Sequence, residues 1–147
     1  MVKVKKVVIP VDFTSTTQKV VDYATSIAEQ LGAEIFFFHV INDFQGYDMM
    51  LVHPSFGAMK EDIQKKYEER MANLVEDYKD FKHGVSGKIV TGDAAEEIVK
   101  FARETGADLI IIGTHGTKGL ERVLMGSTAE KVVKKADCPT LTFNPLK

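Results

Sequence analysis

Short apolar segments alternate with longer amphipathic segments along this sequence, and the alternation strongly restricts the possible folds. The short segments are rich in valine and isoleucine at consecutive positions, which is typical of strands buried on both faces. The longer segments repeat apolar residues at intervals of three and four, as helices with one buried face do. Parallel strands need helical crossovers of this kind. We therefore predict a doubly wound, Rossmann-like α/β fold with a five-stranded parallel sheet and helices on both faces.

The expected elements follow one another without a linker or repeat, so residues 1–147 are predicted to form a single domain. Strands are predicted at 4–11, 34–40, 88–91, 108–112 and 140–143. Helices are predicted at about 15–31, 58–78, 94–105 and 127–136. The segment 42–56 shows no clear period and is predicted to be a loop or flap.

Local signals mark where the helices begin. Ser15 and Gln18 have the spacing of a capping box, and so do Ser127 and Glu130. Asp93 is the expected cap of the helix at 94–105. We therefore expect these side chains to satisfy backbone N–H groups of the first helical turns.

Charge and cysteine content limit the possible partners. The chain carries 19 Lys and Arg against 21 Asp and Glu, a net charge of −2, which makes nucleic acid a poor candidate partner. Its single cysteine, Cys138, cannot form an internal disulfide, and its apolar runs are too short to span a membrane. We expect a cytoplasmic protein without membrane contact.

In doubly wound sheets, ligands bind beyond the carboxyl ends of the strands. The segment after the predicted strand at 108–112 contains four glycines in fourteen positions and ends at a helix start. Glycines allow backbone N–H groups to approach an anion, and a helix start favours phosphate. The alternative is that these glycines supply only tight turns and that Ser127 supplies only a cap.

The spacing Gly113-x2-Gly116-x9-Gly126-Ser127 resembles the nucleotide-binding motif of the universal stress protein family. The resemblance extends over the entire chain. It includes the segments 9–13, 108–116, 126–133 and 136–143.

This resemblance implies the strand order 3-2-1-4-5, a homodimer, and ATP (or ADP or AMP) bound across the strand ends, with Mg²⁺ or Mn²⁺ held mainly through the phosphates. Four residues would flank adenine and ribose: Pro10, Val11, Asp12 and Val40. Eleven would hold ribose and phosphates: Gly113, Thr114, His115, Gly116, Thr117, Lys118, Gly119, Gly126, Ser127, Thr128 and Ala129. The residues themselves suggest no activated catalytic base, and the four histidines are too scattered along the sequence to predict a metal site.

The chemistry of these residue types agrees with that assignment. Asp12 can accept a hydrogen bond from a ribose hydroxyl or from a metal-bound water, although it can also simply cap a helix. Ser127 and Thr128 can donate to phosphate oxygens, and Lys118 can neutralise phosphate charge. His115 is a weak candidate for a general base because no partner carboxylate lies near it in sequence. His39, within an apolar strand, is predicted to be a core histidine.

Other functions remain open at this stage. We expect a nucleotide-dependent regulatory or stress-response protein with at most slow hydrolysis, acting on a protein partner that the sequence does not identify. The alternatives are a dimeric scaffold that needs no nucleotide, a nucleotide hydrolase, and a flavodoxin-like protein that uses Thr14–Thr17 as a phosphate loop. The absence of a Gly-x4-Gly-Lys-Ser/Thr motif excludes a P-loop ATPase. The strand at 140–143 is predicted to lie at a sheet edge, where two copies could pair.

Overall fold

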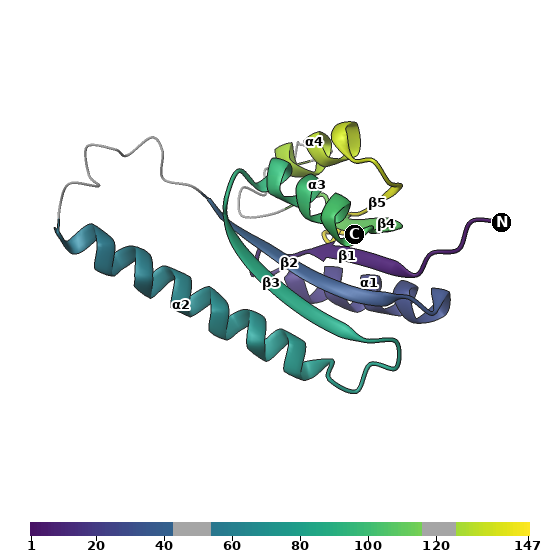
Figure 1. Cartoon of the computed structure of the whole chain (residues 1–147), viewed down its shortest axis with the longest axis horizontal. Coiled ribbons are helices and arrows are strands. Elements are labelled where there is room, and N and C mark those ends of the chain that lie inside the picture. Colours follow the sequence, from purple (N-terminus) through teal and green to yellow (C-terminus); the bar gives the residue numbers. More distant parts are fainter. Residues whose placement is uncertain (43–53, 116–125) are drawn as a thin grey trace.

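The computed structural model describes residues 1–42, 54–115 and 126–147, with backbone only at 54–56. Within these residues it contains, in chain order, β1 (Lys6–Pro10), α1 (Thr17–Leu31), β2 (Glu34–Asn42), α2 (Pro54–Asp77), β3 (Val85–Gly92), α3 (Ala94–Thr105), β4 (Leu109–Gly113), α4 (Ser127–Lys135) and β5 (Thr140–Phe143) (Figure 1). None of the helices in these ranges is long and apolar enough to cross a membrane.

The sheet has the order β3-β2-β1-β4-β5, and every neighbouring pair is parallel. The predicted fold class and strand order are confirmed. The chain passes from β1 to β2 on one side of the sheet and later enters β4 on the other side of β1. The strand order therefore reverses between β1 and β4, which is where ligands bind in folds of this kind.

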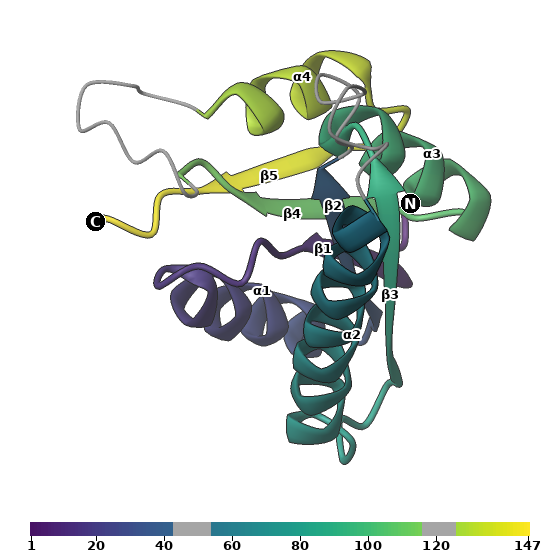
Figure 2. The ribbon, with the colours of Figure 1, turned by 90° about the vertical axis from the view of Figure 1, so that its left-hand side faces the viewer.

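Two helices cover each face of the sheet (Figure 2). On one face, α1 packs on β1, β2 and β4 and α2 packs on β2 and β3, through a cluster that includes Val21, Met71 and Phe37. On the other face, α3 and α4 pack through a cluster that includes Phe101 and Val132. Neighbouring residues of β2 enter opposite clusters, which explains why three consecutive phenylalanines occur there.

Two of the three predicted helix starts are wrong in detail. The N-cap of α1 is Thr16 and that of α4 is Gly126, and neither makes a side-chain capping hydrogen bond. Ser127 is instead the first residue of α4. The cap of α3 is confirmed, because the Asp93 carboxylate accepts a hydrogen bond from the Glu96 N–H at 3.0 Å.

Several boundaries also differ from the prediction. β1 is shorter than 4–11, β2 continues to Asn42, and β3 is twice as long as predicted. Among the described strands, only β2 pairs with β3, and the exposed residues Ser86 to Lys88 gave no apolar signal for that edge strand. Pro54 to Phe56 are helical rather than part of a loop, while the rest of the predicted flap, 43–53, lies outside the described residues.

Candidate functional site

The turn after β1 is organised by Asp12. Its Oδ1 atom accepts hydrogen bonds from the Thr14 N–H at 3.1 Å, the Thr14 hydroxyl at 2.7 Å and the Thr17 hydroxyl at 2.9 Å. These contacts explain why α1 starts after Thr16 instead of after Ser15. Asp12 is exposed, and no described residue hydrogen-bonds its other oxygen, Oδ2. One half of this carboxylate therefore builds the turn, and the other half can accept from a ligand.

The same turn contains a strained residue. Phe13 has φ of 56°, in the left-handed region that side chains other than glycine seldom occupy. Its carbonyl accepts a hydrogen bond from Arg70 Nη1 of α2 at 3.2 Å, and its ring meets the His39 ring edge-on at 5.1 Å. Contacts to α2 and β2 thus hold the turn in this conformation.

Val40 presents its backbone toward the end of β1. In a parallel pair only alternate residues of a strand hydrogen-bond to a given neighbour. In β2, Glu34 N–H donates to Lys5 and Phe38 C=O accepts from the Val11 N–H, so Val40, two residues further on, faces the same side. The last register pair of β1 is Pro10 with Phe38, and Phe38 lies two residues before Val40 in β2. No described residue hydrogen-bonds to the backbone N–H and C=O of Val40 on that side.

His39 lies beside this position on β2. Its Nδ1 atom donates a hydrogen bond to the Val11 carbonyl at 2.6 Å, since a carbonyl can only accept. The residue is 7% exposed, and its ring packs on Tyr67 at 4.5 Å. Burial lowers the pKa of His39 below its usual 6.5, against the opposing effects of the Val11 bond and the Asp12 charge. The prediction of a hydrogen-bonded core histidine is confirmed.

Two motif glycines are required by the protein's own packing. A Cβ atom on Gly113 would lie 2.8 Å from Val20 Cγ2, and one on Gly126 would lie 2.7 Å from the Thr114 carbonyl oxygen. The Gly126 N–H donates to that same carbonyl. This bond brings the start of α4 against the end of β4. The missing side chains of the two glycines therefore allow the close packing on which the site is built.

The first turn of α4 supplies N–H groups at this place. The first α-helical hydrogen bond of α4 runs from the Glu130 N–H to the Gly126 carbonyl at 3.0 Å. The N–H groups of Ser127, Thr128 and Ala129 precede it and have no acceptor within the helix. Ser127 is exposed and Thr128 is half-buried, whereas the Ala129 side chain is buried. Only the backbone of Ala129 could therefore contact a ligand.

The loops after β1 and β4 meet. The Thr16 hydroxyl donates to the His115 carbonyl at 3.5 Å, and the buried Thr114 hydroxyl lies 2.8 Å from His115 Nδ1. The structure thus brings together the predicted residues of 10–12, 113–115 and 126–129 at the carboxyl end of the sheet. The side chains of Pro10 and Val11 are buried, which leaves only their backbone for a ligand. Gly116, Thr117, Lys118 and Gly119 lie outside the described residues.

A separate open groove of about 570 Å³ lies between the first half of α2 and the ends of β2 and β3. Ile41 and Thr91 form its strand side, and residues of α2 with both signs of charge, such as Lys60 and Glu61, form the other. None of the predicted site residues that the structure describes lines this groove. Across the described ranges, no three His, Cys, Asp or Glu side chains gather as a metal site would require.

Comparisons with known proteins agree with this architecture. The model of the universal stress protein family matches residues 3–144. Universal stress protein MJ0531 of Methanocaldococcus jannaschii is 33% identical over 137 residues, which cover 93% of this chain and 80% of that protein.

Solved structures show the same relationship. The structure of MJ0577, from the same organism, has a TM-score of 0.85 at 30% identity and covers 97% of both chains. The structure of the universal stress protein from Archaeoglobus fulgidus in complex with dAMP has a TM-score of 0.66 at 21% identity, covering 94% of this chain and 96% of that one. From the family match and these relatives, we conclude that the chain belongs to the universal stress protein family.

Proposed function

We propose that this protein binds an adenine nucleotide, ATP or its products ADP and AMP, where the strand order reverses between β1 and β4. The bound nucleotide would control its interaction with a partner in the cytoplasm. One observation carries the proposal: the Val40 N–H and C=O, on a residue only 8% exposed, face the ligand side of the sheet without a described partner. The related structure with dAMP supports an adenine nucleotide as the ligand.

Val40 suits adenine in particular. Adenine offers a ring-nitrogen acceptor beside its amino donor, which matches the N–H and C=O of one residue in an extended strand. Guanine presents a carbonyl acceptor beside a ring N–H donor, so its hydrogen-bonding pattern is reversed along the same edge. We therefore expect ATP to bind more tightly than GTP.

Asp12 and the start of α4 would hold the two other parts of the nucleotide. The Oδ2 atom of Asp12 can accept from a ribose hydroxyl or from a water on a phosphate-bound Mg²⁺ or Mn²⁺. The N–H groups at the start of α4, which have no acceptor within the helix, can donate to phosphate oxygens, and the helix dipole favours that negative charge. A net charge of −2 does not oppose this binding, because backbone groups supply the positive end of the interaction.

The proposal assigns binding and no catalytic residue. The Thr114 hydroxyl lies 2.8 Å from Nδ1 of His115, but Thr114 is buried, so this hydroxyl is poorly placed to reach a substrate as a nucleophile. We expect any hydrolysis to be slow.

We also propose a homodimer formed through β5. This strand lies at the sheet edge, where its free backbone groups can pair with a second copy. Phe143 on β5 stacks on Tyr23 of α1 at 4.5 Å, which gives that edge an aromatic surface. Sedimentation at micromolar concentration tests this assignment, and a monomer would contradict it.

A pair of substitutions at Ser127 tests nucleotide binding. Ser127→Asp places a negative charge at the first position of α4, where it stabilises the helix by about 0.3–1 kcal/mol but repels a phosphate. Ser127→Asn has nearly the same shape without the charge. Titration calorimetry should show ATP affinity falling about tenfold or more in the Asp variant, less for AMP, and adenosine affinity unchanged.

Equal ATP affinity in the Asp and Asn variants would contradict the placement of phosphates at α4. No ATP binding by the wild-type protein would contradict the proposed function itself. In that case partner binding that survives without nucleotide would favour the dimeric scaffold.

A further inference from the structure

We propose that His39 is a positioning residue that keeps the Val40 backbone available to the ligand. Its Nδ1–H donates to the Val11 carbonyl, which in regular strand pairing would accept from the Val40 N–H. The inference rests on the proposed nucleotide function, because that function gives a ligand to the Val40 N–H and C=O, which no described residue bonds on the β1 side. The hydrogen bond that carries it joins the His39 side chain to the Val11 carbonyl.

The register identifies the bond that is missing. Pro10 is paired with Phe38, and the Val11 N–H donates to the Phe38 carbonyl at 2.8 Å. In a regular parallel ladder the next bond along runs from the Val40 N–H to the Val11 carbonyl. That bond is not formed in the described structure. The Val11 carbonyl accepts instead from His39 Nδ1 at 2.6 Å.

The surroundings of His39 fix it in this role. Successive side chains of a strand point to opposite faces, so the imidazole lies on the face covered by α1 and α2, while Val40 belongs to the other cluster. The Tyr67 and Phe13 rings contact the imidazole, and Arg70 holds the Phe13 carbonyl at 3.2 Å. These contacts hold the turn after β1 in place while His39 occupies the Val11 carbonyl, and the ladder ends one bond early.

Ordinary core packing does not account for this arrangement. A leucine at position 39 would fill the space beside Tyr67 and would leave the Val11 carbonyl to pair with Val40. The observed arrangement instead leaves the Val40 N–H, on a residue that is 8% exposed, without an acceptor among the described residues, and a buried donor without an acceptor lowers stability. A ligand that accepts a hydrogen bond from Val40 would recover that loss.

Hydrogen exchange of the Val40 amide in the ligand-free wild-type protein tests the inference without any substitution. We expect the amide to exchange at least about tenfold faster than its strand neighbours Ile35 and Phe37, and to slow when ATP is added. An amide as protected as those neighbours in the ligand-free protein would overturn the inference.

Two isosteric substitutions provide the matched comparison. His39→Asn keeps a side-chain N–H donor for the Val11 carbonyl, whereas His39→Leu removes it. We expect slow exchange of the Val40 amide in the Leu variant and fast exchange in the Asn variant. The Leu variant should also bind ATP at least about tenfold more weakly than the Asn variant, while both bind inorganic tripolyphosphate, which has no base, equally well.

Equal Val40 exchange in the Leu and Asn variants would overturn the inference, whether or not ATP binds. If wild-type protein does not bind ATP but the exchange difference is present, the proposed function fails while the action of His39 on the ladder stands. If the Leu variant does not fold, the exchange measurement on the wild-type protein decides.

Discussion

The contact between Gly113 and Val20 predicts a compensating pair of substitutions. A Cβ atom at position 113 would lie 2.8 Å from Val20 Cγ2, against an ordinary carbon–carbon separation of about 3.5–4.0 Å. Gly113→Ala alone should therefore cost about 1–3 kcal/mol through overpacking. Val20 is buried, and Val20→Ala alone should cost about 1.6 kcal/mol or somewhat more, because two buried methylene equivalents are lost and a cavity remains.

The double variant should be more stable than the sum of the single effects, since the new methyl group enters the space that the valine leaves. We expect a coupling of about 1–2 kcal/mol, measured by urea unfolding with a constant m-value. Gly126→Ala is the matched control. Its Cβ would meet the Thr114 backbone carbonyl at 2.7 Å, which no side-chain truncation relieves, so its effect should add to that of Val20→Ala. Additivity within about 0.5 kcal/mol for Gly113→Ala with Val20→Ala would refute this reasoning.

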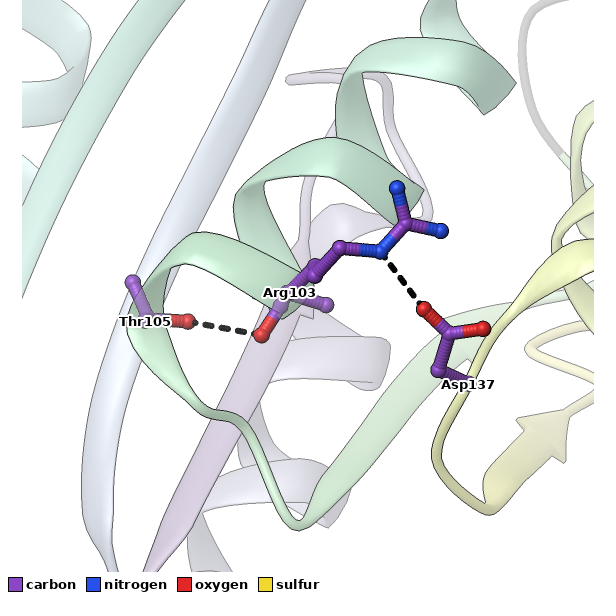
Figure 3. Close-up of polar contacts among 4 residues, drawn as sticks. Arg103, Thr105 and Asp137 are labelled. Atoms are coloured by element: carbon purple, nitrogen blue, oxygen red, sulfur yellow. Dashed lines mark hydrogen bonds and ion pairs between the residues drawn. The ribbon is translucent and has the colours of Figure 1, made fainter.

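Three further predictions concern stability and reactivity. Burial lowers the pKa of His39 in the folded protein, so the unfolded chain binds more protons near pH 6.5. As the pH drops from about 8 through that value, the free energy of unfolding of the wild-type protein should therefore fall relative to that of His39→Asn. Parallel pH profiles of the two proteins in urea unfolding would contradict this. Arg103 Nε pairs with Asp137 Oδ2 at 2.7 Å between α3 and the connection after α4, but both side chains are more than 60% exposed, so Arg103→Ala should cost no more than about 1 kcal/mol in thermal unfolding (Figure 3). Burial raises the pKa of the Cys138 thiol, so it should react with a disulfide reagent at neutral pH more slowly than a free cysteine, and equal rates would argue against its burial.

The layers could be predicted because they follow from a pattern that recurs along the chain, whereas the strand order was implied by the family resemblance. Ile35 and Phe37 enter one cluster while Phe38 and Val40 enter the other, so β2 had to be apolar at consecutive positions. The edge strand β3 was predicted too short because residues near its start, Ser86 to Lys88, are exposed and carry no apolar pattern. Its pairing with β2 uses backbone groups, which leave no pattern in the side chains.

The helix starts could not be predicted from spacing alone. Ser15 with Gln18 matches a capping box, but the Asp12 carboxylate binds Thr14 and Thr17 and moves the start of α1. At α4 the Thr114 carbonyl holds the Gly126 N–H, so Ser127 becomes part of the helix. Both outcomes depend on contacts formed by the fold around the turn.

The candidate site was predicted in its position but not in its construction. Asp12, Val40 and the start of α4 lie at the carboxyl ends of the strands, where ligands bind in this fold. The sequence placed His39 in the core, yet its bond to Val11 depends on the register of β1 against β2, which the sequence pattern does not specify. The glycines at 113 and 126 were interpreted as letting backbone N–H groups approach an anion, which stays a prediction. The structure adds a packing reason for them, because a Cβ at either position would meet Val20 or Thr114.

The most direct test of the central claim is to look for nucleotide in the purified protein. The protein is denatured, the supernatant is separated by anion exchange, and adenine nucleotide is quantified against the protein chain. We predict one adenine nucleotide per chain, or, for protein purified empty, one ATP site per chain by calorimetry. A supernatant without nucleotide, together with no heat of binding for ATP, would contradict the account.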